Sequence, residues 1–243
     1  MKFLTILLLV YSGHTLATSD EAVTLNVAVA TNFRAPLLIL REHFETQSRI
    51  GIAPTFGASG LLTAQIRQGA PFDVFLSADA VRPRALVDDG FAEAPSITYA
   101  EGRVALWTPG RAATPSQIAG KRLAIANPPV APYGHAAAQC LRQLGLWETV
   151  EAHLVFGHNV SQVNHFVTTS AVPAGFVALS QLLAARTPAA NYWVCPPSYH
   201  DPIDQQAVVL AASTKPDAAR AFLQFLTDSD TQALLATLGY PRR

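Results

Sequence analysis

Short polar residues follow apolar runs at two places near the start of the chain. Thr31 and Asn32 come directly after the run 25–30, and Ser59, preceded by Ala58, comes after the run 51–56. A helical pattern begins at each of these points, where hydroxyl and amide side chains accept hydrogen bonds from the free N–H groups of a first helical turn. The same N–H groups, at the positive end of the helix dipole, can hold an anion. Two such junctions facing each other would form an oxyanion site without any Lys or Arg.

The middle of the chain repeats this arrangement. The apolar run 123–126 leads into a helical pattern near Tyr133, and the run 153–156 leads to Asn159 and Val160. A single junction of this kind is more often an ordinary helix cap than a ligand site. Four of them favour a shared cleft, because ligands of open α/β sheets bind outside the carboxyl ends of the strands.

Strand and helix patterns alternate along the chain, which predicts an α/β fold with two doubly wound lobes and a hinge between them. We expect parallel sheets with helices on both faces. The predicted strands are 25–30, 51–56, 74–76, 104–108, 122–126, 153–156, 175–178 and 207–211. The predicted helices are 35–47, 61–68, 80–88, 136–144, 162–169, 179–185, 216–226 and 230–238.

Proline-rich stretches suggest where the chain passes from one lobe to the other. They lie near Pro109 and between Cys195 and Pro202. We therefore expect a signal peptide at 1–17, a first part of lobe 1 at 18–106, lobe 2 at 107–200 and a second part of lobe 1 at 201–243.

The first residues have the three parts of an export signal. Lys2 is followed by the apolar stretch 3–11, which is too short to span a bilayer, and then by a cleavage pattern that ends at Ala17. The alternative is a buried first strand or helix. No later stretch has the length and apolar character of a transmembrane helix. We expect an exported, soluble mature protein.

Composition limits the class of partner. The 243 residues are 50% hydrophobic and 14% charged, with a formal net charge of zero. This is typical of a globular protein and argues against a nucleic-acid partner, which usually selects for a basic surface. The two cysteines, Cys140 and Cys195, are able to form a disulfide in an oxidising compartment or to remain as separate buried thiols.

One block is specific enough to indicate a family. Residues 65–79 read QIRQGAPFDVFLSAD and follow the junction at 56–60; the segments 159–161 and 175–180 provide further matches. With these residues the chain resembles the periplasmic molybdate-binding proteins of ABC importers, which are type II periplasmic solute-binding proteins. The resemblance covers essentially the whole mature chain.

The resemblance implies a receptor without catalysis or cofactor. It would act in the periplasm as a monomer, capture molybdate or tungstate between its lobes, and deliver the anion to a membrane permease. Neutral donors alone hold the oxyanion in that family, so no residue would ligate the metal directly. The positions carried over as ligand-binding are Thr31, Asn32, Ala58, Ser59, Tyr133 and Val160, the last through its backbone N–H.

Two departures from the family bear on selectivity. Many members have Ser at the first site, where this chain has Thr31 and Asn32, and many have Tyr where this chain has Ala178. Tyr133 is the candidate for supplying the missing phenol from another loop, and the sequence leaves open whether it contributes its hydroxyl or only its N–H.

A site of donors alone also discriminates physically. It leaves a ligand O–H without an acceptor, so it disfavours an anion that carries a proton, such as phosphate near neutral pH. Sulfate carries no such proton, so a receptor for sulfate or another tetrahedral oxyanion is the main alternative.

A serine hydrolase is the second alternative. Ser59 lies in a sequence similar to the G-x-S-x-G nucleophile motif, but Leu61 stands where the last glycine is needed. His153, His158 and His165 have no metal-ligand spacing, and we expect them to be surface or supporting residues.

Overall fold

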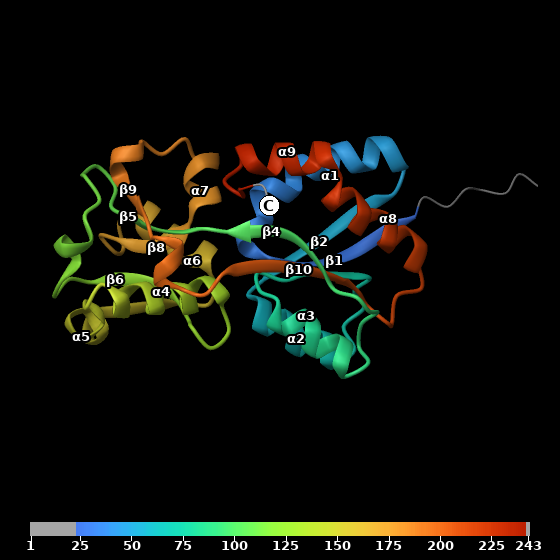
Figure 1. Ribbon diagram of the computed structural model, residues 1–243, viewed down its shortest axis with the longest axis horizontal. Helices are drawn as coiled ribbons and strands as arrows, with labels where there is room; N and C mark the ends of the chain where they lie inside the picture. The colour runs from blue at the N-terminus through green and yellow to red at the C-terminus, as the bar shows by residue number, and fades with distance from the viewer. Residues whose placement is uncertain (1–22, 242–243) are drawn as a thin grey trace, which may run out of the picture.

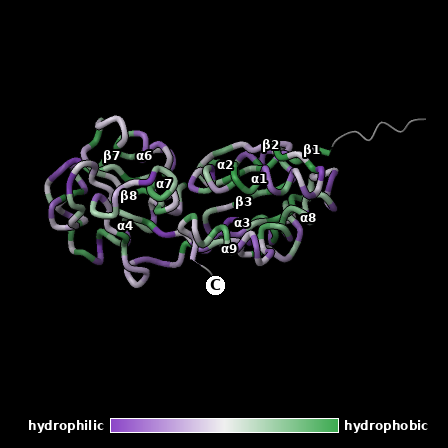
Figure 2. The backbone as a smooth tube through the Cα atoms, turned by 90° about the horizontal axis from the view of Figure 1, so that it is seen from above, coloured by the Kyte–Doolittle hydropathy of each residue, from purple (hydrophilic) through white to green (hydrophobic). Residues whose placement is uncertain are grey.

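The structure is a computed structural model that describes residues 23–241. Two lobes lie side by side along the long axis of the molecule, and each contains one five-stranded sheet (Figure 1). The view at right angles shows the same two bodies in line (Figure 2). The expected signal peptide at 1–17 lies outside the described residues.

The first lobe is formed by both ends of the described chain. Its sheet has the strand order β2-β1-β3-β10-β4. The strands are β1 (Thr24–Ala30), β2 (Gly51–Gly57), β3 (Val74–Leu76), β4 (Ile97–Gly102) and β10 (Ile203–Val209), and the helices are α1 (Arg34–Ser48), α2 (Ser59–Arg67), α3 (Val81–Asp88), α8 (Pro216–Thr227) and α9 (Ser229–Thr237). A short 3-10 turn, η1 (Thr31–Phe33), joins β1 to α1.

Both faces of this first sheet are buried. Leu25, Val27 and Val29 of β1 pack with residues of α1, α8 and α9. The alternate residue Ala28 packs on the other face with residues of α2 and α3. Because successive side chains of a strand point to opposite faces, a strand covered on both sides has to be apolar throughout, as β1 nearly is.

The second lobe is formed by the middle of the chain. Its sheet has the strand order β7-β6-β8-β5-β9. The strands are β5 (Val104–Trp107), β6 (Leu123–Ala126), β7 (Leu154–Gly157), β8 (Gly175–Ala178) and β9 (Tyr192–Val194), and the helices are α4 (Pro132–Gln143), α5 (Trp147–Val150), α6 (Val160–Thr168) and α7 (Leu179–Ala184).

Each sheet is mixed, whereas the sequence predicted parallel sheets. β10 runs antiparallel to β3 and β4, and β5 runs antiparallel to β8 and β9. The strands β1, β2 and β3 are parallel, as are β6, β7 and β8. A parallel neighbour needs a crossover helix, and β5 and β10 enter their sheets from the other lobe without one.

The chain changes sheet at two places. It passes from β4 to β5 at Arg103, three residues before the expected boundary at 106, because Val104 to Trp107 pair within the second sheet. It returns between β9 and β10. The division of the chain into lobes at the predicted residue numbers stays a prediction.

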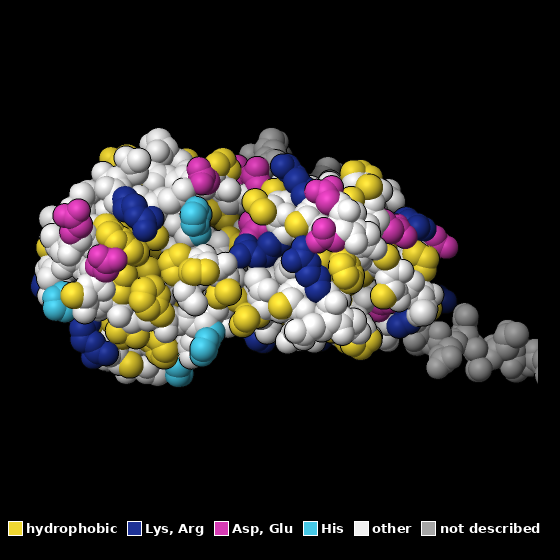
Figure 3. Space-filling view, turned by 90° about the horizontal axis from the view of Figure 1, so that it is seen from below, with side chains coloured by type: hydrophobic (Ala, Val, Ile, Leu, Met, Phe, Trp, Pro, Cys, Tyr) yellow, Lys and Arg dark blue, Asp and Glu magenta, His cyan; other side chains and the backbone are white. Residues whose placement is uncertain are grey.

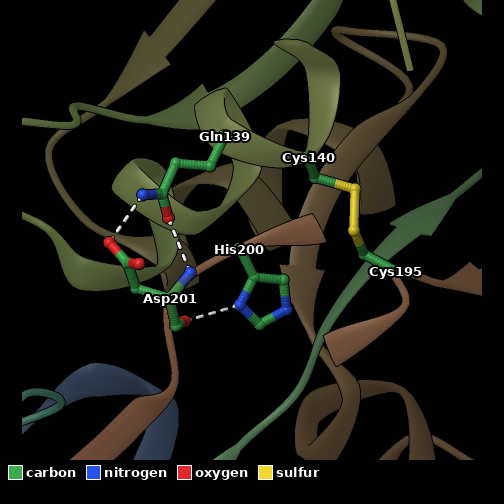
Figure 4. The surroundings of a disulfide bond; sticks show 5 residues. All are labelled: Gln139, Cys140, Cys195, His200 and Asp201. Atoms are coloured by element: carbon green, nitrogen blue, oxygen red, sulfur yellow. Dashed lines mark hydrogen bonds between the residues drawn. A yellow bond between two sulfur atoms is a disulfide. The ribbon is translucent and has the colours of Figure 1, made fainter. Parts of the chain in front are cut away.

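A disulfide joins Cys140 of α4 to Cys195 after β9, with the two Cα atoms 6.5 Å apart. The neighbouring Gln139 donates to the Asp201 carboxylate at 2.6 Å and accepts from the Asp201 backbone N–H at 3.0 Å (Figure 4). The segment that returns to the first lobe is therefore fixed to α4 at two successive points.

Candidate oxyanion site

One cavity lies between the lobes, where the starts of η1, α2, α4 and α6 meet. It contains about 200 Å³ of empty space. All six positions singled out in the sequence line it. The lining consists of Ala30, Thr31, Asn32, Gly57, Ala58, Ser59, Ala78, Ala131, Pro132, Tyr133, Asn159 and Val160.

The first lobe contributes Thr31 and Asn32 at the end of β1. Backbone N–H groups of a first helical turn have no partner within the helix, so those of η1 are available to a ligand. The Asn32 side chain is not available in the same way, because its Nδ2 donates to Gln205 Oε1 at 2.8 Å and to Tyr240 Oη at 3.1 Å. Both amide protons are thus used inside the protein, and Asn32 offers its backbone N–H.

Ser59 contributes a hydroxyl at the start of α2. Its Oγ accepts the backbone N–H of Ala78 at 3.0 Å, and Ala78 also lines the cavity. Because this lone pair is occupied by a fixed donor, the hydroxyl proton is free to donate elsewhere. Ser59 is only 1% exposed, so this proton lies at the cavity and away from bulk water.

The second lobe contributes Tyr133 near the start of α4. The Tyr133 hydroxyl accepts from Gln205 Nε2 at 3.2 Å. It also lies against Gly102, where an added Cβ would be 2.3 Å from the phenol oxygen. The phenol is therefore directed to the strands that connect the lobes, which favours the backbone N–H as the Tyr133 group nearest a ligand.

Val160 is the first residue of α6, and Asn159 caps this helix. The Asn159 side chain accepts from the Gln162 N–H at 3.0 Å, so the cap uses the third N–H of the helix. The Val160 N–H belongs to the first residue of the helix, so it has no partner within the helix. Val160 therefore lines the cavity with this N–H unused by the helix, and its role as a ligand donor stays a prediction.

The cavity is uncharged. Among the described residues that line it there is no Lys, Arg, His, Asp or Glu. Neutral donors avoid leaving a buried charge without a partner when the site is empty.

The outer surface differs from the cavity in its charge. On the face seen in Figure 3, acidic and basic side chains are interspersed.

A buried hydrogen-bond network lies beside the site. It connects Asn32, Gln205, Tyr240, Tyr133 and Tyr99, whose hydroxyl donates to Gln205 Oε1 at 3.1 Å. Burial raises the pKa of the Tyr99 and Tyr133 phenols well above 10.0, and the neighbouring Tyr240 raises both further. Burial also raises the pKa of Tyr240, although hydrogen bonds with Ser180 and Asn32 oppose this. All three phenols are neutral at physiological pH.

The lobes also contact each other at the mouth of the cleft. The Gly60 N–H donates to the Val130 carbonyl at 3.0 Å, and Arg82 Nη2 donates to the Pro129 carbonyl at 2.9 Å. A Cβ on Gly60 would lie 3.0 Å from Val130 backbone atoms, so a glycine permits this close approach of the two backbones. These contacts between the lobes therefore lie next to the lining residues Ser59 and Ala131.

Neither the metal nor the hydrolase arrangement is assembled in the described part of the chain. No three His, Cys, Asp or Glu side chains within residues 23–241 come together to hold a metal ion. The cavity lining also provides no His, Asp or Glu to act as a base toward Ser59. Within the same residues no helix has the length and apolar character needed to cross a membrane.

Comparison with known proteins identifies the family. A family model described as bacterial extracellular solute-binding protein matches residues 25–241. The chain belongs to this family.

Several relatives of this solute-binding protein have named ligands. It is 38% identical over 223 residues to the molybdate-binding protein ModA of Rhodobacter capsulatus, a match that covers 88% of this chain and 86% of that protein. The solved structure of the Azotobacter vinelandii periplasmic molybdate-binding protein superposes with a TM-score of 0.84 and 36% identity, covering 89% of this chain and 98% of that one.

A more distant structure shows how far the fold extends. The sulfate-binding protein SubI of Mycobacterium tuberculosis has a TM-score of 0.75 at 15% identity, covering 90% of this chain and 86% of that one. At that identity the likeness concerns the fold alone.

Proposed function

We propose that this solute-binding protein captures molybdate or tungstate in the cavity between its lobes. One observation supports this above the others: six positions from four helix starts, far apart in the sequence, line one uncharged cavity. The named relatives at 36–38% identity bind molybdate, which gives the anion.

The ligand set that we propose consists of neutral donors. Thr31 and Asn32 donate from the first turn, Ser59 donates its hydroxyl and its N–H next to Ala58, and Tyr133 and Val160 donate backbone N–H groups. A tetrahedral dianion accepts several such bonds, and hydrogen bonds to an ion are stronger than those between neutral groups. None of these donors needs a counter-charge in the empty site.

The same donors would select against a protonated anion. A ligand O–H would face N–H and O–H donors only, and a buried donor without an acceptor costs about 1–3 kcal/mol. This disfavours phosphate. It does not separate molybdate from sulfate, and sulfate receptors share the fold, so we assign that discrimination to the size of the closed cavity.

We propose that closure of the lobes is the working step. An anion that contacts both lobes binds the closed arrangement better and shifts the population toward it. The closed protein would then dock on the membrane permease of an ABC importer. We propose that it does so as a monomer in the periplasm, after export directed by residues 1–17. In this scheme it performs no catalysis and needs no cofactor.

Titration calorimetry tests the proposal. Purified protein without bound anion is titrated with molybdate, tungstate, sulfate and phosphate. Tight binding of molybdate and tungstate, with no heat from sulfate or phosphate, is the expected result. If sulfate binds as tightly as molybdate, the proposed ligand is wrong but the proposed mechanism stands. If none of the four anions binds, the proposal is overturned.

A further inference from the structure

Two serine hydroxyls of the second lobe reach the first-lobe turn. Ser161 Oγ donates to the Thr31 carbonyl at 3.2 Å, and Ser180 Oγ donates to the Asn32 carbonyl at 3.2 Å. Ser161 is in α6 and Ser180 is in α7, whereas Thr31 and Asn32 form the start of η1. The two bonds therefore join the lobes directly at the residues that line the cavity.

The direction of the Ser161 bond is fixed by its neighbours. Ser161 Oγ accepts from Gln181 Nε2 at 3.0 Å, and Gln181 Oε1 accepts from the Ala178 N–H at 3.2 Å. Because the amide supplies the donor on that side, the serine proton has to point to the Thr31 carbonyl. This carbonyl also accepts the Arg34 N–H, which uses its second lone pair.

The Ser180 bond is more deeply buried. Ser180 is 3% exposed, and its Oγ lies 3.1 Å from the Tyr240 hydroxyl, which in turn lies 3.1 Å from the Asn32 carbonyl. Serine, tyrosine and carbonyl thus form a closed triangle of oxygen atoms across the junction of the lobes.

We propose that Ser161 and Ser180 form a latch for the closed arrangement, a role that rests on the function proposed above. Neither serine lines the cavity, so they are positioning residues and not ligands. Both hydroxyls would return to water when the lobes separate, so their bonds to the turn stabilise the closed state alone.

The latch also orients a ligand donor. The Thr31 carbonyl and the Asn32 N–H belong to one planar trans peptide unit, in which the two groups point in opposite directions. Holding the carbonyl from the second lobe therefore fixes the direction of the N–H. Hydrogen bonds in such a chain also strengthen one another, so closure would make this N–H a better donor.

Serine-to-alanine variants test the latch. We expect Ser161→Ala and Ser180→Ala each to weaken molybdate binding by about 3- to 10-fold, and the double variant by about 10- to 100-fold, in titration calorimetry. The unfolding midpoint of the anion-free protein should stay at the wild-type value, and so should the ratio of molybdate to tungstate affinity. Ser161→Thr keeps the hydroxyl and should bind as the wild type does.

Ser48→Ala is the matched control, because Ser48 donates to the Phe44 carbonyl within α1, away from the junction. Wild-type molybdate affinity in the double variant would overturn the latch. A loss of anion-free stability equal to the loss of affinity would also overturn it, because the serines would then act in both states.

A second measurement tests the latch independently of the proposed ligand. If wild-type protein fails to bind molybdate, the proposed function fails. Small-angle scattering of wild type and double variant, both at the half-saturating concentration of whichever oxyanion the wild type binds, then tests the latch separately from the identity of the anion. A larger radius of gyration in the double variant supports it, and equal radii contradict it.

Discussion

At the scale of single residues, Ser59 uses its hydroxyl oxygen in two directions. The oxygen accepts the Ala78 N–H at 3.0 Å and leaves its own proton for the cavity. We expect Ser59→Ala to weaken molybdate binding by about 1–3 kcal/mol, the usual cost of losing a hydrogen bond to a charged group. Titration calorimetry measures this.

Thr63→Ala is the control for Ser59, since it removes a hydroxyl that donates to the Ser59 carbonyl at 2.8 Å without lining the cavity. Unchanged affinity in Ser59→Ala would remove Ser59 from the ligand set.

The Tyr133 hydroxyl gives a different expectation. It accepts from Gln205 and faces the strands between the lobes, so Tyr133→Phe removes no proposed ligand donor. The variant should bind molybdate within about tenfold of wild type, but lose about 1–3 kcal/mol of unfolding free energy, because Gln205 Nε2 is left buried without this acceptor. Urea denaturation and calorimetry on the same sample separate the two effects. Abolished binding would instead make the phenol a ligand.

The positions of the candidate residues could be predicted from sequence where the signal was local, whereas their roles as ligands stay predictions. Thr31, Ser59 and Val160 each stand at a helix start, and a helix start exposes N–H groups whatever the rest of the fold does. Gln205 and Tyr240 carry no such signal, because a polar residue within a strand or after the last helix reaches the site only through tertiary packing. The internal use of the Asn32 amide was hidden for the same reason.

At the scale of elements, the sequence missed one edge strand of each sheet, although it predicted the opposite edges β2 and β7. β4 and β9 were not predicted, and β10 begins at Ile203 where the prediction began at 207. β4 and β9 lie at the outer edge of their sheets. An edge strand is covered less completely, so polar residues such as Thr98 and Glu101 interrupt its apolar pattern. The buried central strands β1, β3, β6 and β8 gave clear runs.

The disulfide connects two elements of the second lobe, α4 and the segment that follows β9. The sequence left open whether the two cysteines form a disulfide or remain separate thiols. In the structure Cys140 and Cys195 are joined, 55 residues apart in the sequence. We expect the double variant Cys140→Ala, Cys195→Ala to lose about 2–4 kcal/mol of unfolding free energy, since the bond restricts the unfolded chain. Denaturant titration measures the loss. Molybdate affinity should be unchanged, and a large loss of affinity would mean that the bond also sets the position of Tyr133 in α4.

At the scale of the whole molecule, the buried tyrosines link stability to pH. Their raised pKa values mean that the folded protein keeps phenol protons that the unfolded chain releases above about pH 10. Below that pH this contribution is complete, and above it the unfolding free energy should fall as pH rises. Tyr99→Phe should reduce the slope of unfolding free energy against pH. Thermal unfolding from about pH 8 to about pH 11, a range that brackets the ordinary tyrosine pKa, would measure this slope. Equal slopes in variant and wild type would contradict the assignment.

The uncharged cavity has an electrophoretic consequence. The full sequence has 17 basic and 17 acidic side chains and a formal net charge of zero. Among the described lining residues, no carboxylate, histidine or basic group is present to take up or release a proton when a dianion enters. Loading therefore changes the charge of the particle by about two units without compensation. Empty and loaded protein would then migrate as separate bands in a native gel, although their folds and masses are nearly the same.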